Sequence, residues 1–438
     1  MRRALAAALV AAAALAAAPA AATALSPPAP DRAVTVLSTR RLDARLLELT
    51  VRTPALASPT RVRVLLPDGY SAAASRRYPV LYLLHGAGGD ESGWTRAGGV
   101  EQATANLPLI VVMPDGGRAG WYTNWRNGGR GGPPEWETWH TSQLVRLVDS
   151  RFRTIAARRG RAIAGLSMGG FGALSYAARH PDLYTAAAGF SGGVDLELRL
   201  YGQPAGKITV AATAPNDGGK ADSVFGDFDT QNILWRGHNP PDLAANLRGL
   251  ALGLYTGNGQ PGGPLGGPAD LDIIELGAHD MSVNVHRRLA RLGIPHVWDD
   301  YGRGAHTWPY WARDLRWTLP WLMRRFAHPA PPPARVRYTS IESAYEDFGW
   351  RVSIRRPNVE FSTLSGAWRG GFSLTGSGTA AVTTPPAYRP GARLRLRIDR
   401  GRRSASLLAR ADRTGRLRVA LGLPRRGATA RVQIRAAG

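Results

Sequence analysis

Apolar and polar residues follow two different patterns along this chain of 438 residues. Between about residues 34 and 327, short continuous apolar runs, such as Pro79–Leu84 and Leu109–Met113, are separated by segments with helical spacing, such as Thr141–Asp149. Continuous runs are typical of strands buried on both faces. Their alternation with helices predicts an α/β fold, with a mostly parallel sheet covered by helices on both faces.

The pattern changes after a proline-rich linker at residues 328–334, where the backbone is expected to be extended and semi-rigid. In residues 335–438 apolar side chains recur at every second position, for example at 352–355, 372–375, 381–384, 394–398 and 417–421. Period-two runs separated by turn residues predict a C-terminal all-β, sandwich-like domain. Within the first region, residues 205–229 have no clear period, and we interpret them as an insertion or lid near the mouth of the active site.

The N-terminus predicts export. Two arginines, an Ala-rich apolar run and a small-residue site at Ala22-Thr-Ala24 are typical of a signal peptide over residues 1–24. A membrane anchor is the alternative, but the run is dominated by alanine and interrupted by Pro19, and a span needs about 20 strongly apolar residues. Residues 25–33 would be a leader, and 34–327 the catalytic domain. We therefore expect a secreted or envelope-located protein.

The amino-acid composition excludes several kinds of active site and indicates which partners the chain could bind. The chain has no cysteine, which excludes disulfides, zinc–thiolate sites and cysteine nucleophiles. Its formal net charge is +24, and residues 335–438 hold 21 arginines against six acidic residues. This basic domain is expected either to pack against the first domain or to attach to an anionic cell-envelope surface. For the overall charge we prefer another explanation, that a genome rich in G and C favours arginine codons. No recognisable nucleic-acid-binding motif is present, so no nucleic-acid partner is expected.

One short segment carries a chemical signature. Gly165-Leu-Ser-Met-Gly169 follows a buried apolar run and precedes a helical pattern of small residues. In a G-x-S-x-G turn between strand and helix, the serine hydroxyl is exposed above the sheet as a nucleophile. Ser167 is therefore the candidate nucleophile, provided that a histidine and an acid reach it.

The partners should follow Ser167 in the order acid, then histidine. His306 lies in a Gly-containing loop after the last predicted strand and is the candidate base, whereas His180, His296 and His328 resemble surface or structural residues. Glu275 and Asp280 both lie in the segment before it, and local pattern leaves either as the acid.

Oxyanion donors are expected from two backbone amides. One is the amide of Met168, next to the nucleophile. The other is predicted at Ala87, with Gly88 second, in the glycine-rich loop after Pro79–Leu84; His85 in that loop is expected to make a structural hydrogen bond. His279, Asp280 and His286 are the nearest approach to a metal-binding pattern, but no comparable metal motif exists, so neither a metal nor a cofactor is expected.

Several separated blocks resemble a known family. Tyr82-Leu-Leu-His-Gly86, Trp136-Glu-Thr-Trp-His-Thr-Ser142, Gly165-Leu-Ser-Met-Gly-Gly170 and Gly304-Ala-His-Thr-Trp-Pro-Tyr-Trp311 are similar to blocks of the antigen-85 mycolyltransferases and the wider esterase-D-like α/β-hydrolases. The resemblance covers residues 79–325 and leaves out the C-terminal domain. It implies an α/β-hydrolase fold.

The resemblance also implies roles for particular residues. It points to a Ser167–Glu275–His306 triad with Ala87 and Met168 as oxyanion donors, and it favours Glu275 over Asp280 as the acid. Trp308 would line the acyl or acceptor pocket, and Trp136 would support that pocket. The mycolyltransferases carry an aspartate where this chain has His85, whereas esterase relatives commonly have histidine there.

We therefore predict an exported serine esterase or acyltransferase that acts on acyl esters, including lipids or glycolipids, through an acyl-enzyme. Transfer of the acyl group to a sugar such as trehalose is the sharper alternative. A catalytically idle secreted binding protein and an envelope-attached structural protein are the alternatives from other classes.

Overall fold

The computed structural model describes residues 34–200 and 202–437, which belong to one compact unit. The predicted signal peptide (1–24) and leader (25–33) lie outside these residues. Within the described ranges, no helix combines the length and the apolar character that a membrane span requires.

The first region is built on a nine-stranded sheet in the order β1-β2-β3-β5-β4-β6-β7-β10-β11. The first three strands are antiparallel to their neighbours, and the rest, from β5 to β11, run parallel. The strands are β1 Thr35–Arg41, β2 Leu46–Arg52, β3 Thr60–Leu65, β4 Val80–Leu84, β5 Ile110–Pro114, β6 Arg161–Leu166, β7 Ala186–Phe190, β10 Ala251–Thr256 and β11 Val297–Asp300.

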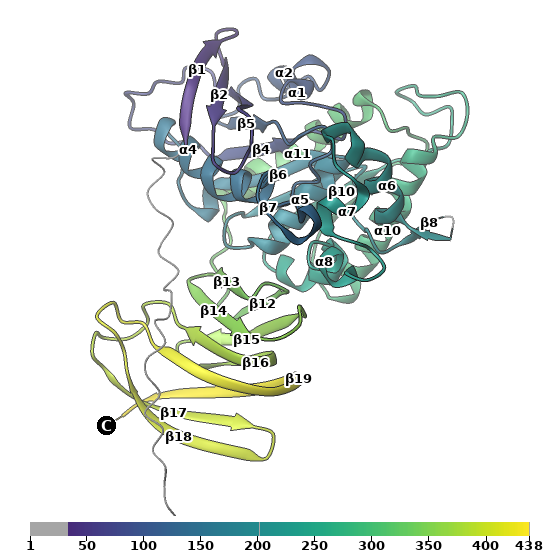
Figure 1. The fold of residues 1–438 in the computed structure, drawn as a ribbon. Coiled ribbons are helices and arrows are strands. Elements are labelled where there is room, and N and C mark those ends of the chain that lie inside the picture. The colour runs from purple at the N-terminus through teal and green to yellow at the C-terminus, as the bar shows by residue number, and fades with distance from the viewer. Residues whose placement is uncertain (1–33, 201, 438) are drawn as a thin grey trace, which may run out of the picture. The chain divides into compact units, whose positions relative to one another are not determined.

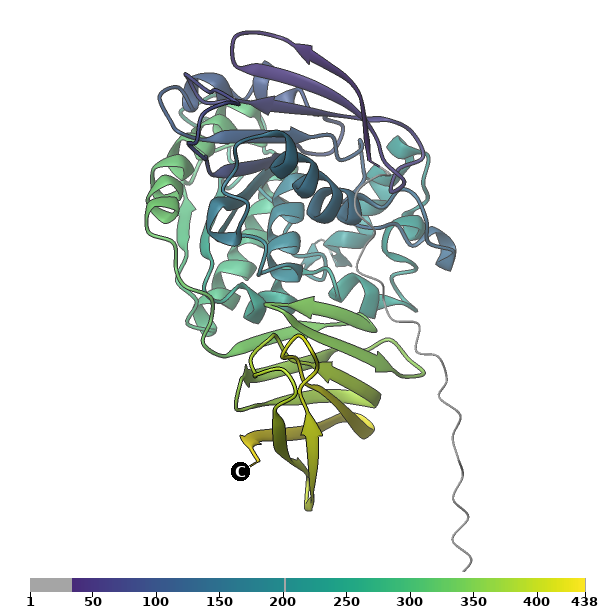
Figure 2. The ribbon, with the colours of Figure 1, turned by 90° about the vertical axis from the view of Figure 1, so that its left-hand side faces the viewer.

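Helices cover both faces of this sheet (Figure 1 and Figure 2). They are α1 Gly93–Arg96, α2 Val100–Ala103, α3 Trp136–Thr138, α4 Leu144–Arg151, α5 Met168–Arg179, α6 Ala205–Thr213, α7 Ala221–Phe225, α8 Asn232–Arg236, α9 Pro240–Leu243, α10 Ile273–Arg291 and α11 Trp308–Ala327. The mostly parallel α/β architecture predicted from the apolar runs is confirmed.

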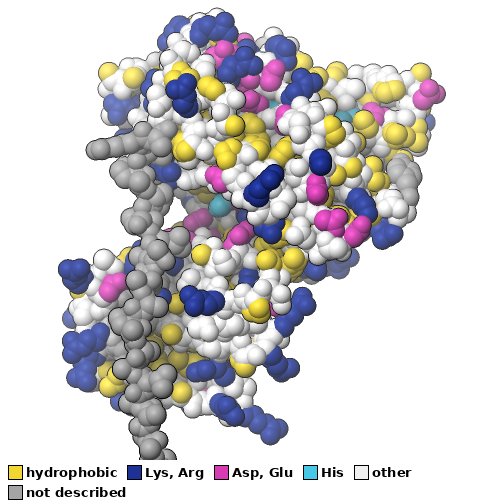
Figure 3. All heavy atoms as spheres, in the orientation of Figure 1, with side chains coloured by type: hydrophobic (Ala, Val, Ile, Leu, Met, Phe, Trp, Pro, Cys, Tyr) yellow, Lys and Arg dark blue, Asp and Glu magenta, His cyan; other side chains and the backbone are white. Residues whose placement is uncertain are grey.

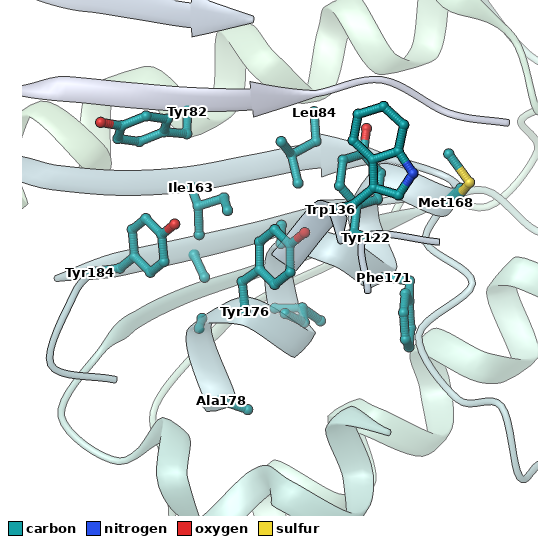
Figure 4. Packing of buried hydrophobic residues seen from close by; sticks show 14 of the residues in the cluster. Tyr82, Leu84, Tyr122, Trp136, Ile163, Met168, Phe171, Tyr176, Ala178 and Tyr184 are labelled. Carbon is teal, nitrogen blue, oxygen red and sulfur yellow. The ribbon is translucent and has the colours of Figure 1, made fainter. Parts of the chain in front are cut away.

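Strand β4 shows why those runs are continuous. Successive side chains of a strand point to opposite faces. Tyr82 and Leu84 join the larger core on the face covered by α5, while Leu81 and Leu83 join a second core with residues of α11. Figure 4 shows Tyr82, Ile163 and Tyr184 gathered near Tyr176 of α5. Because both faces are buried, no position of the strand is left for a polar residue.

Residues 205–229, predicted only as an aperiodic insertion, contain the helices α6 and α7. In α6 the periodicity of apolar residues is weak because small residues make part of the contacts. A Cβ on Gly206 would lie 2.8 Å from the Cβ of Leu196 and 3.1 Å from the ring of Trp235. A lid role for this segment stays a prediction.

The second region is all-β, as predicted. Its sheet has the order β12-β15-β16-β19-β17-β18, with β14 also paired to β16 and β13 to β14. Its strands are β12 Val336–Ser340, β13 Ala344–Asp347, β14 Trp350–Arg355, β15 Ser362–Trp368, β16 Gly371–Thr383, β17 Arg393–Arg400, β18 Arg403–Arg410 and β19 Arg418–Ala436; two short strands of the first region, β8 Arg199–Leu200 and β9 Gln203–Pro204, form a separate hairpin.

The runs 372–375 and 381–384, predicted as separate strands, are almost wholly parts of the single strand β16, which ends at Thr383. The intervening glycines form an irregularity between Gly376 and Gly378 instead of a turn, and the facing strand β19 accommodates extra residues there. Side chains from both halves of β16, among them Leu374 and Val382, contribute to one core. The sheet therefore bends around its own apolar face.

Hydrogen bonds join the two regions at the end of the helix that follows the candidate nucleophile. Arg179, the last residue of α5, donates to Glu342 at 3.0 Å and to Glu137 at 2.7 Å, and its carbonyl accepts from the Tyr338 hydroxyl at 2.6 Å. The side-chain amide of Asn246 donates to the Thr339 carbonyl and accepts from the Thr339 N–H, each at 2.9 Å. The domain boundaries and the independence of the two regions stay predictions.

Candidate active site

Ser167 stands at the apex of the turn between β6 and α5, as its motif predicts. Its φ and ψ are 52° and −119°, a region that L-residues rarely adopt. The turn is possible because two glycines let strand and helix touch: a Cβ on Gly165 would lie 2.3 Å from the Gly169 oxygen, and one on Gly169 would lie 2.5 Å from the His85 oxygen. The hydroxyl is thus carried to the carboxyl edge of the sheet, where α/β proteins bind ligands.

His306 lies between β11 and α11 and reaches Ser167 across the sheet edge. The Ser167 Oγ is 2.9 Å from His306 Nε2, and His306 Nδ1 is 2.8 Å from Glu275 Oε2. A carboxylate at Nδ1 holds the proton there and leaves Nε2 to accept the proton of the hydroxyl. The three residues therefore form a continuous hydrogen-bonded relay, although 139 positions separate Ser167 from His306 in the chain.

Glu275 is completely buried at the start of α10, so its charge needs local compensation. Its Oε1 atom receives three donors from the ends of two strands: the Ser191 hydroxyl after β7 at 2.8 Å, and the Thr256 hydroxyl at 3.3 Å and the Gly257 amide at 2.7 Å at the end of β10. Because these donors occupy Oε1, Oε2 is left to face His306. The carboxylate is thereby fixed in position and its charge is stabilised.

Asp280, the other candidate acid, lies away from this relay. It is exposed, and its side-chain contact is with His279, at 3.4 Å. Five residues of α-helix turn the chain by about 140° beyond one full turn, so Glu275 and Asp280 project from different sides of α10. Only Glu275 faces the imidazole.

Asp272 is a residue of the site that the sequence analysis missed. One carboxylate oxygen caps α10 by accepting from the amides of Ile274 and Glu275, each at 3.1 Å, and the other accepts from the His306 amide at 2.8 Å. One side chain thus ties the helix of Glu275 to the loop of His306. The spacing Asp-x-x-Glu at a helix start resembles a capping box and was the available signal. Ser191, which adopts a φ of 43° after β7, had no such signal.

Asp272→Ala should separate these two elements. We expect kcat on a soluble ester to fall by roughly 10- to 100-fold, because small misplacements of catalytic groups are costly. The free energy of unfolding should fall by about 1–2 kcal/mol through loss of the cap. Enzyme assays well below the unfolding temperature and chemical denaturation would measure both. Asp272→Asn keeps one acceptor oxygen, which can cap the helix but cannot also accept from the His306 amide, so it should recover the lost stability but only part of the lost kcat. An alanine variant with native kcat would contradict this positioning role.

The loop after β4 presents a free amide to the site. Gly88 donates its N–H to the Arg118 oxygen at 2.6 Å, so it is already used. By contrast, no hydrogen bond in the described part of the chain employs the amide of Ala87 or of Met168. A Cβ on Gly86 would lie 3.2 Å from the Cβ of Ser167, which puts this loop directly beside the hydroxyl. The amide of Ala87, unlike that of Gly88, is therefore available for the predicted oxyanion role, which stays a prediction.

His85 holds this loop in place, as expected, and is buried. Its Nε2 accepts from the Gly116 amide at 2.9 Å and its Nδ1 lies 2.8 Å from the Gly86 oxygen, while the Tyr122 hydroxyl donates to its carbonyl at 2.8 Å. The loop after β5, which contains Gly116, is in turn held by Asp217, whose carboxylate accepts from the Arg118 and Ala119 amides at 3.0 and 2.7 Å.

Trp136 also belongs to this support. Its indole lies close to Gly117 and Gly120 and stacks on His140, with ring centroids 5.7 Å apart. Burial lowers the pKa of His140 to about 4, so its imidazole is neutral and bonds to the Asp115 oxygen at 2.9 Å. Trp136 is 8% exposed, and a direct contact with substrate stays a prediction.

Trp308 is the accessible member of an aromatic row beside His306. Ring centroids are 5.0 Å apart for His306 and Trp311, 5.3 Å for Trp311 and Trp308, and 5.4 Å for Trp308 and Trp94. Trp94 and Trp311 are buried, whereas Trp308 is half-buried. Its position is suited to the wall of an acyl or acceptor pocket.

Four of the six other histidines form hydrogen bonds with other side chains. His279 pairs with Asp300 at 3.1 Å, His286 with His296 at 2.8 Å, and His180 with Glu137 at 2.8 Å. Among the residues that the structure describes, no group of His, Asp and Glu side chains is arranged to hold a metal ion.

The first region of the chain is similar to known proteins. A protein family described as "Putative esterase" matches residues 53–322. Esterase Rv1288 of Mycobacterium tuberculosis is 35% identical over 255 residues, which are 58% of this chain and 54% of that protein. The diacylglycerol acyltransferase/mycolyltransferase Ag85B of Mycolicibacterium smegmatis is 32% identical over 258 residues, 56% of this chain and 76% of the relative.

The fold has solved counterparts. The crystal structure of MPT51 from Mycobacterium tuberculosis has a TM-score of 0.52 and 22% identity, and the match covers 63% of this chain and 97% of that one. The present chain spans about half the length of the Rv1288 esterase. The family match ends at residue 322, so the second sheet lies outside it. Over its first region, this chain belongs to the esterase family and is related to the antigen-85 mycolyltransferases.

Proposed function

We propose that this protein is a serine esterase or acyltransferase that acts on acyl esters with Ser167, His306 and Glu275 as its catalytic triad. The observation that carries the proposal is the unbroken relay of hydrogen bonds, 2.9 Å from Ser167 to His306 and 2.8 Å from His306 to Glu275. The two unused amides beside Ser167 support it independently, because acyl transfer needs donors for a developing oxyanion.

The chemistry follows from these positions. Ser167 Oγ attacks the ester carbonyl while its proton moves to His306 Nε2, and the charged Glu275 stabilises the imidazolium. The amides of Ala87 and Met168 donate to the carbonyl oxygen as it becomes negative. The tetrahedral intermediate collapses, the C–O bond to the alcohol breaks, and His306 protonates the leaving alcohol. Water or a second alcohol, deprotonated by His306, then attacks the acyl-enzyme and releases Ser167.

The position of Trp308 favours esters that have an apolar acyl group, or an acceptor that stacks on an aromatic ring. Its half-buried ring contacts Trp311, which in turn contacts the imidazole, and it offers apolar surface near the site. The names of the relatives, an esterase and a diacylglycerol acyltransferase/mycolyltransferase, support lipid or glycolipid esters as the substrate class. Because the chain has His85 instead of an aspartate in the oxyanion loop, we favour hydrolysis of a range of esters over strict transfer to trehalose.

A panel of p-nitrophenyl esters of increasing acyl length, each with and without trehalose, tests this proposal. We expect nitrophenol release and free acid as the main product, with acyl-trehalose a minor one. Acyl-trehalose formation that outpaces hydrolysis would replace the esterase assignment by the mycolyltransferase-type activity. No release from any ester, and no phosphonylation of Ser167 by a fluorophosphonate, would favour the catalytically idle binding protein.

We also propose that the protein acts outside the cytoplasm, after removal of residues 1–24. The support is the sequence pattern alone: basic residues, an apolar run and the Ala22-Thr-Ala24 site. Mass spectrometry of the protein from the culture medium and the envelope fraction should find an N-terminus at Leu25. An intact N-terminus confined to the cytoplasm would contradict export.

A further inference from the structure

The second region carries an unusually basic face. Along β17, apolar residues Leu394, Leu396 and Ile398 point into the core, and the alternate residues point outward. The antiparallel register with β18 and β19 places further arginines on the same outer side. We call this the arginine face; its exposed members are Arg393, Arg395, Arg397, Arg410, Arg431 and Arg435.

Two pairs of these arginines occupy directly facing positions on neighbouring strands. Arg393 lies directly opposite Arg410, and Arg395 directly opposite Arg435. Like charges at facing positions of an antiparallel pair destabilise a sheet. Folding alone gives no reason for two such pairs on one face.

Acidic residues compensate little of this charge. Asp399 lies opposite Arg431 in the register and accepts from Arg397 at 3.0 Å. No other ion pair of the arginine face is found in the described residues. Figure 3 likewise shows many dark blue side chains and few magenta ones on the part of the molecule that holds this sheet. The excess of positive charge is thus left for a partner.

A groove adjoins the arginine face. It has a volume of about 550 Å³, and Arg431 and Arg435 of the face form part of its lining. Trp368 follows an irregularity in β15 and is 40% exposed, with the Arg335 guanidinium 4.8 Å from its ring centre. Ser365, Ser373 and Gln433 also line the groove. The groove therefore combines a flat aromatic ring, hydrogen-bonding side chains and cations.

We propose that the groove and the arginine face together bind a linear anionic polysaccharide. A sugar ring would pack on Trp368, its hydroxyls would bond to Ser373 and Gln433, and its carboxylate or other anionic groups would reach the arginines. Alternate residues of a strand are about 7 Å apart, so the face repeats positive charge at regular intervals along β17. A repeating polyanion crosses several such positions and relieves the repulsion between facing arginines.

The same surface is less suited to other polyanions. Single-stranded nucleic acids are usually bound on several exposed aromatic rings in succession. Of the two aromatic residues that line this groove, Trp368 is exposed, whereas Phe372 is buried in the core. Elements that lie on membranes present a band of apolar residues, whereas the outer side of β18 offers Leu408 between serines and Arg410. Both alternatives are separate outcomes of the test.

The test measures binding of the full chain to polygalacturonate and to dextran sulfate, with neutral dextran as the uncharged control. Vesicles of phosphatidylglycerol and a single-stranded oligonucleotide of mixed sequence serve as competing polyanions. We expect binding to one or both anionic polysaccharides, weakened by salt, and none to neutral dextran. Absence of polysaccharide binding would overturn the proposal, and so would tighter binding to the vesicles or the oligonucleotide.

Two sets of variants locate the site. Arg395→Gln/Arg435→Gln should weaken polysaccharide binding by roughly 30-fold, about fivefold for each charge near an anionic surface, and Trp368→Ala should also weaken it. Because the double variant removes a repulsive pair, its unfolding temperature should stay the same or rise, and its activity on a soluble ester should not change.

The matched control is Arg355→Gln/Arg418→Gln, which removes two exposed arginines from the other half of the sheet. We expect it to bind nearly as tightly as the native chain. An equal loss in this control would mean that net charge alone drives binding and would overturn the assignment to the arginine face.

Discussion

Ser167→Ala should abolish turnover of ester substrates, with kcat reduced by a factor on the order of 10⁵ to 10⁶. Alanine removes the only oxygen that His306 can activate within the relay, and nothing else in that hydrogen-bonded line can form an acyl-enzyme. Steady-state assays on a p-nitrophenyl ester would measure the loss, and labelling by a fluorophosphonate should disappear.

Ser150→Ala is the matched control, because Ser150 is an exposed serine on α4 that bonds only to the local backbone. It should keep native kcat and native labelling. Circular dichroism would establish that the Ser167 variant is folded. Residual activity above a few per cent, or continued labelling at another residue, would contradict Ser167 as the nucleophile.

Glu275→Gln should cost nearly as much, about 10³- to 10⁴-fold in kcat, without unfolding the protein. Three donors point at Oε1, so the glutamine oxygen should occupy that position and its NH₂ group should face His306 Nδ1. An imidazole that receives a proton donor at Nδ1 must carry its own proton on Nε2. It can then no longer accept the proton of Ser167.

Asp280→Asn makes the comparison decisive, because it removes the other candidate carboxylate from the same helix. We expect kcat within about twofold of native, since surface substitutions away from the site have small effects. Both variants should be assayed with the same ester and checked by thermal unfolding. A large loss in Asp280→Asn together with a native Glu275→Gln would reverse the assignment of the acid.

The residues of the central sheet were predictable because burial on two faces leaves a simple signal. Strands β4, β5 and β6 are covered on both sides, so their sequences are continuously apolar and could be located to within a residue or two. Helix α6 was not predictable from periodicity. Its contacts are made by small residues such as Gly206 against Trp235, and small residues leave no amphipathic pattern.

In the candidate site, Ser167 and His306 could be identified by their local context, a glycine-bounded turn and a glycine-containing loop after a late strand. The choice between Glu275 and Asp280 could not be made from residue pattern, since both lie on one helix at neighbouring positions; the family resemblance was needed to favour Glu275. The structure separates them by the direction in which each side chain leaves α10. Asp272 had a local signal as a helix cap but none for its bond to the His306 amide. Ser191 and Thr256 are polar residues of ordinary type, and only their convergence on Glu275 distinguishes them.

The sequence by itself determined the fold class of each region and the buried strands of the central sheet, because periodicity, turn residues and the nucleophile motif act over a few neighbouring residues. It also determined the order of nucleophile, acid and histidine along the chain. Only the tertiary structure decided which carboxylate meets the imidazole, which loop amide stays free, and that the arginines of β17, β18 and β19 face one another. Those outcomes depend on contacts between residues tens to more than a hundred positions apart, which local patterns do not encode.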